Sequence, residues 1–110
     1  MTNNILYTQK LPDYEGFQIT FNALVEDDYP DWDFESEEEK QQLFKDIESG
    51  KLTWFCAQIT ASKHGIKLGD SYLGGCCYNS YEQFIEETAP DLTYDAVEIA
   101  KKNILLLTKE

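Results

Sequence analysis

Apolar and polar residues alternate near the start of the chain. From Phe17 to Ala23 every second residue is apolar, and glutamine, threonine and asparagine stand between them. A period of two is typical of a half-buried strand, which we expect to continue to about Val25. A short edge strand is predicted before it, around Ile5 to Tyr7, and Pro12 is expected to end that strand.

Two further strands are predicted in the middle of the chain. Leu52 to Ala61 is rich in aromatic and β-branched residues and contains no breaker, as in a central strand. Ser62 to Asp70 carries two glycines and is expected to connect a hairpin, with Ser71 to Tyr78 as the returning strand. Gly74 and Gly75 weaken that strand and indicate either a bulge or a helix packed closely above it.

A helix is predicted from about residue 37 to residue 49. Ser36 followed by Glu39 has the spacing of a capping box, in which side chains bond the free backbone amides of the first turn. Gly50 supplies a C-terminal stop. The apolar face of this helix consists of Leu43, Phe44 and Ile47.

Two more helices are expected in the last third of the chain. Ser80 and Gln83 form a second capping box, for a short helix that ends near Glu87. Pro90 then breaks the chain. Beyond it, apolar residues recur at steps of three and four, which predicts a helix that begins at about residue 91 or 93 and continues to 107. The recurring positions are Val97, Ala100, Ile104 and Leu107.

The order of these elements implies an α+β fold. We expect a small antiparallel sheet of three or four strands with two or three helices packed on one face. With 110 residues the chain is large enough for one core and too small for two, so residues 1–110 are expected to form a single acidic domain.

Net charge restricts the function more than any other property. The chain holds 21 acidic residues against 9 basic ones, all of them lysine, which gives a net charge of −12. We expect no direct binding to nucleic acid or to an anionic membrane, because these carry charge of the same sign. The expected partner is a basic, Lys/Arg-rich protein surface. The alternative is an acidic surface that serves only solubility.

The sequence predicts a cytoplasmic protein. No stretch approaches the roughly 18 apolar residues that a membrane span needs, and the first ten residues lack the pattern of a signal peptide. The three cysteines, Cys56, Cys76 and Cys77, are odd in number and two are adjacent. This suits a reducing compartment better than a disulfide framework.

Motifs for catalysis, cofactors and metals are missing from the sequence. His64, the only histidine, is expected in a solvated loop with no nucleophile motif around it. Cys76 and Cys77 are neighbours in a strand, so they should point to opposite faces and fill tight positions rather than share a metal ion. No phosphate-binding glycine motif and no complete calcium loop is present. We expect no enzyme, no cofactor and no metal site, and rank a small metal-dependent enzyme last.

The strongest functional signal is the acidic segment from Glu26 to Glu39. It places nine carboxylates and no basic residue in fourteen positions. This density approaches that of duplex DNA, which presents about one negative charge per 1.7 Å of axis. The predicted partner-binding residues are Glu26, Asp27, Asp28, Asp31, Trp32, Asp33, Glu35, Glu37, Glu38 and Glu39.

Aromatic residues are interleaved with these carboxylates. Tyr29, Trp32 and Phe34 stand inside the acidic segment, and aromatic residues are enriched where interfaces bind tightly. The alternative is that Trp32 and Phe34 staple the loop onto the core ahead of Ser36. The two interpretations carry equal weight.

Two stretches of the chain have a pattern known from other proteins. WFCAQITAS at residues 54–62 and GDSYLGGCCYNSYEQF at residues 69–84 form a Trp-containing strand, a Gly/Cys-rich strand and an acidic helix. This pattern resembles a group of small acidic proteins encoded by phages, prophages and plasmids, and the resemblance covers roughly residues 12–100. It carries no catalytic motif. It implies a mobile-element gene expressed in a bacterial host, where such proteins are often inhibitors of the anti-CRISPR or antirestriction type.

We therefore expect a non-enzymatic protein, a DNA-mimic inhibitor of a host nucleic-acid-binding or defence protein. The alternative is a small scaffold or homodimer of a mobile element without mimicry. Its mostly apolar contact would use Trp32, Phe34, Trp54 and Tyr78. Replacing Glu37, Glu38 and Glu39 with glutamine should impair a mimic and leave the partner of a scaffold bound.

Overall fold

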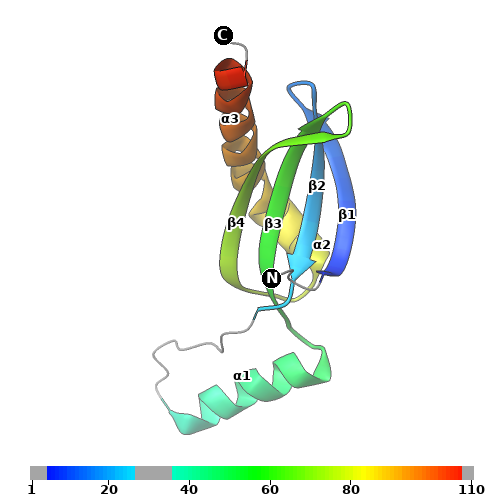
Figure 1. Ribbon diagram of the computed structural model, residues 1–110. Coiled ribbons are helices and arrows are strands. Elements are labelled where there is room, and N and C mark those ends of the chain that lie inside the picture. The colour runs from blue at the N-terminus through cyan, green and yellow to red at the C-terminus, as the bar shows by residue number, and fades with distance from the viewer. Residues whose placement is uncertain (1–4, 27–35, 108–110) are drawn as a thin grey trace.

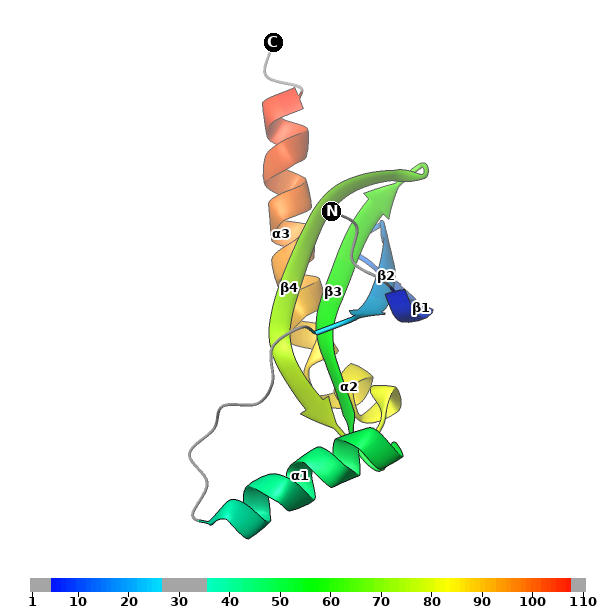
Figure 2. The same cartoon turned by 60° about the horizontal axis from the view of Figure 1, so that its bottom comes forward.

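The chain forms a four-stranded antiparallel sheet and three helices in the residues that a computed structural model describes, 5–26 and 36–107 (Figure 1). The strands are β1 (Ile5–Tyr14), β2 (Phe17–Leu24), β3 (Thr53–Lys63) and β4 (Ile66–Tyr78), and the helices are α1 (Glu37–Ser49), α2 (Tyr81–Glu87) and α3 (Ala89–Leu107). The strands follow one another in the order β1-β2-β3-β4, and α2 and α3 cover one face of the sheet (Figure 2). The predicted α+β class is confirmed.

Two tight turns connect the strand pairs β1–β2 and β3–β4. The first turn is Glu15–Gly16 and the second is His64–Gly65, and all four residues have φ between 50° and 84°. Positive φ at both central positions gives a turn whose twist matches that of the strands, so pairing continues up to the turn. The predicted connection over Ser62–Asp70 is therefore wrong, because both strands extend into it.

β1 extends through the proline that the sequence suggested as its end. It continues past Pro12 to Tyr14, so the predicted end is wrong. β1 lies at one edge of the sheet, and its register against β2 shifts between Leu11 and Tyr14. A proline, which has no amide hydrogen to donate, is tolerated at such an irregular edge. The proline and the irregular register also make this edge a poor template for another strand.

The glycines of β4 have two different roles. The register of β4 against β3 shifts opposite Cys56, and Gly74 and Gly75 form a bulge there. This confirms the predicted bulge. The close approach of a helix occurs earlier in the strand, where a Cβ on Gly69 would collide with the backbone of Ala96 in α3.

The core lies between the sheet and the helix pair α2 and α3. Phe21, Phe55 and Phe84 come from β2, β3 and α2, are fully buried, and have ring centroids 5.1 to 6.0 Å apart. Two of these contacts are edge-on and one is stacked, and such contacts add to the free energy that burial of the rings contributes. Ala96 and Ala100 are also fully buried, and their small side chains let α3 lie close to β4.

α3 begins earlier than predicted and ends beyond the sheet. It starts at Ala89, with Pro90 in its first turn, where a missing amide donor is tolerated. The predicted start at 91 or 93 is therefore wrong by a few residues. The last turn, Leu105–Leu107, projects past the sheet and its side chains are 68% to 70% exposed (Figure 2). Leu107 thus belongs to the predicted apolar face but has no strand beneath it.

Candidate partner-binding surface

The acidic segment begins just after β2, at Glu26. The Glu26 carboxylate accepts a hydrogen bond from the backbone N–H of Gly75, with an oxygen to nitrogen distance of 2.5 Å. Gly75 belongs to the bulge in β4, which is an edge strand. The Glu26 side chain therefore accepts from a backbone amide that would otherwise be open to another strand. Glu26 therefore anchors the start of the acidic segment to the sheet, and a partner that captured this carboxylate would have to displace it.

Most of the predicted contact residues lie outside the described residues. These are Asp27, Asp28, Asp31, Trp32, Asp33 and Glu35. The aromatic residues Tyr29 and Phe34 lie there as well. The predicted contact residues that the structure describes are Glu26 and the three glutamates at the start of α1.

Glu37, Glu38 and Glu39 form the first turn of α1, and all three are exposed. The hydroxyl oxygen of Ser36 accepts from the backbone N–H of Glu39 at 3.3 Å, and Gly50 ends the helix with a φ of 87°. Both predicted ends of this helix are confirmed. Three carboxylates at a helix N-terminus are stabilised by the positive end of the helix dipole. This first turn is therefore a concentrated patch of negative charge.

α1 stands apart from the rest of the molecule, beyond one end of the sheet (Figures 1 and 2). None of its residues is buried, whereas α3 buries five. On the face of α1 that Glu39 shares, the side-chain amide of Gln42 donates to the carboxylate of Asp46 at 2.9 Å. We call α1 the acidic arm. Four of its five carboxylates are exposed to solvent, and the fifth, Asp46, is half-buried.

A second acidic surface lies on α2 and α3, and the sequence-based reasoning missed it. From Tyr81 to Ala100 the chain has six carboxylates and no basic residue. Five of these six are exposed, and the sixth, Glu98, is half-buried and pairs with Lys101 at 3.3 Å. Lys101 also binds Glu15 in the β1–β2 turn at 2.7 Å. The absence of basic residues from Tyr81 to Ala100 indicates this surface in the sequence, although the segment before α1 has the higher density of carboxylates.

The open face of the sheet, which α2 and α3 leave uncovered, carries a row of polar side chains across all four strands. The hydroxyl of Thr8 donates to Asn22 at 2.8 Å, and Asn22 donates to Gln58 at 3.0 Å. Gln58 donates to the hydroxyl of Tyr72 at 2.8 Å, and that hydroxyl donates to Asp70 at 3.4 Å. The row satisfies its own hydrogen-bonding groups. This face is polar and carries little charge, so it does not extend the acidic surface.

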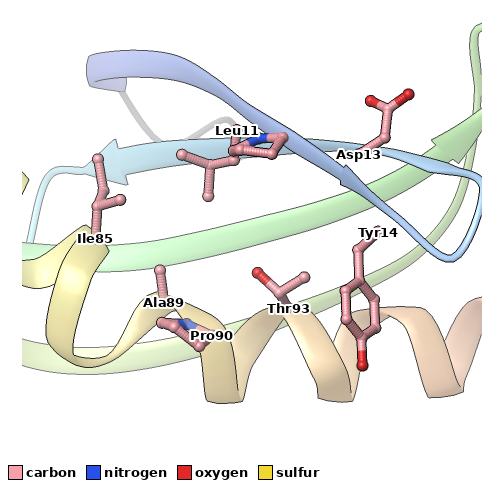
Figure 3. Close-up of a pocket in the computed structure, with 8 residues that line it drawn as sticks. Leu11, Asp13, Tyr14, Ile85, Ala89, Pro90 and Thr93 are labelled. Atoms are coloured by element: carbon pink, nitrogen blue, oxygen red, sulfur yellow. The ribbon is translucent and has the colours of Figure 1, made fainter.

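A small apolar pocket lies between the second half of β1 and the junction of α2 with α3 (Figure 3). Its volume is about 240 Å³, and Leu11, Tyr14, Ile85 and Thr93 are among the residues that line it. Asp13 lines it as well, but its carboxylate points away from the helices (Figure 3). Sites for small molecules and cofactors usually measure about 300 to 1,000 Å³ and contain several convergent polar groups. The pocket does not meet this description.

The cysteines and the histidine of the described residues have ordinary, unactivated surroundings. The side chain of Cys76 is buried, and burial raises its pKa to about 11. Burial also raises the pKa of Cys56 and of Cys77, so all three thiols are protonated near neutral pH. His64 is exposed at the β3–β4 turn. Within residues 5–26 and 36–107, no three histidine, cysteine or carboxylate side chains lie close enough to hold a metal ion.

Two of the aromatic residues assigned to the alternative apolar contact belong to β3 and β4. Tyr78 packs its ring edge-on against Phe84 with centroids 5.3 Å apart, so it lies partly buried against the core. Trp54 is half-buried. Trp32 and Phe34 lie outside the described residues. Tyr78 and Trp54 are thus both half-buried, and the alternative apolar contact stays a prediction.

Comparisons with other proteins add no relative. No family model matches the chain, and neither a curated protein nor a solved structure matches it. No helix in the described parts of the chain is both long and apolar enough to cross a membrane.

Proposed function

We propose that this protein is a non-enzymatic inhibitor that binds the nucleic-acid-binding surface of a host protein and presents carboxylates in place of phosphates. The placement of Glu37, Glu38 and Glu39 carries the proposal. These three exposed carboxylates occupy the first turn of a helix that stands clear of the sheet. A Lys/Arg-rich groove shaped for a nucleic acid can reach such an arm without meeting the body of the domain.

The charge of the chain supports the same kind of partner. The 25 residues from Glu26 to Gly50 hold 11 of the 21 acidic residues, against two lysines. Complementary charge accelerates encounter with a basic surface, and a rise in salt weakens it. Because the arm is exposed, its ion pairs with a partner would be screened within about 10 Å at 0.1 M salt.

The resemblance to small acidic proteins of mobile elements supports a bacterial cell as the place where the protein acts. We place the protein in the cytoplasm of a bacterial host, where a nuclease of a defence system or another DNA-binding protein is the target. The partner is then recognised through its phosphate-binding lysines and arginines, with no contact between this chain and nucleic acid.

Two triple variants with the same change in charge test the proposal. Glu37, Glu38 and Glu39 are replaced by glutamine in one, and Glu82, Glu86 and Glu87, which belong to α2, in the other. Tagged protein is incubated with bacterial lysate at low and high salt, bound proteins are identified by mass spectrometry, and the recovered protein is assayed for DNA binding. We expect wild type to compete with DNA, and the α1 variant to bind on the order of tenfold more weakly, whereas the α2 variant is unchanged.

Three results would contradict the proposal. The captured protein could bind equally well at high salt, or it could bind DNA undisturbed in the presence of this protein. Equal losses for the two triple variants would show that overall charge, and not the arm, is recognised.

A further inference from the structure

We draw no further inference here: the strongest candidate, the exposed apolar surface of Leu106 and Leu107 where the last turn of α3 projects past the sheet, carries none because nothing in the structure shows what covers it.

Discussion

The side-chain amide of Asn103 in α3 donates a hydrogen bond to the backbone carbonyl of Leu68 in β4, at 2.6 Å. β4 is an edge strand, and the outward-facing backbone groups of such a strand are a template for pairing with another chain. The hydroxyl of Ser71 in β4 makes a second link by donating to the carbonyl of Leu92 in α3, at 2.7 Å. α3 therefore covers one face of the sheet, and it also occupies a backbone carbonyl at the edge that another chain could otherwise pair with.

Replacing Asn103 with leucine should destabilise the fold by about 1 to 2 kcal/mol, because the Leu68 carbonyl loses its partner. The free energy of unfolding is measured by urea titration with tryptophan fluorescence. The control is Lys102→Leu, which adds the same side chain at an exposed neighbour and should stay within about 0.5 kcal/mol of wild type. Similar losses in both variants would assign the effect to the added leucine and not to the lost hydrogen bond.

Alanine at position 69 should be costly, because its Cβ would collide with the backbone of Ala96 and Ala100. Overpacking of this kind costs about 1 to 3 kcal/mol, and here α3 must move away from β4 to relieve it. Gly74→Ala is the comparison, since the nearest atom to its Cβ would be the carboxylate of Glu26, at 3.1 Å, which can move. Unfolding by urea should rank wild type above Gly74→Ala and Gly74→Ala above Gly69→Ala. The reverse order of the two variants would place the tighter backbone contact at the bulge.

Local signals explain what the sequence predicted well. Ser36 and Gly50 mark the two ends of α1, and Ser80 marks the start of α2, so these helices are specified by residues within a few positions of their ends. β2 was predictable because one of its faces is buried, so its apolar and polar residues alternate, and β3 because it is rich in aromatic and β-branched residues and has no breaker. The two-residue turn at His64–Gly65 was not, since the usual signal for such a turn is Asn-Gly or Asp-Gly.

The parts of the surface that escaped prediction depend on contacts between distant residues. Glu26 and Gly75 are 49 positions apart, and no local pattern indicates their hydrogen bond. The polar row from Thr8 to Tyr72 exists only once the register of all four strands is known. Composition predicted the acidic segment, but only the fold shows that its first carboxylate is anchored to the sheet and that α1 stands clear of it.

Glu26→Ala should open the bulge in β4 locally. The Gly75 amide would lose its acceptor, and the loss of a charge-assisted hydrogen bond corresponds to roughly tenfold faster amide hydrogen exchange where opening is local. Exchange rates by NMR check this, with Glu37→Ala as the control that removes a carboxylate exposed on α1. An unchanged rate at Gly75 in Glu26→Ala, or the same increase in both variants, would contradict the anchoring role.

Stability should fall at alkaline pH, with Cys76 as one identifiable cause. Burial, with smaller contributions from Cys56, Glu26 and Cys77, raises the pKa of the Cys76 thiol from 9.0 to about 11. Between these two values the folded protein keeps a proton that the unfolded chain has lost, so the free energy of unfolding decreases as pH rises from 9 towards 11. Cys76→Ala removes this contribution, and urea unfolding across that range should show a shallower decline for the variant than for wild type. If the two declines are parallel, the thiol is not held protonated by the fold.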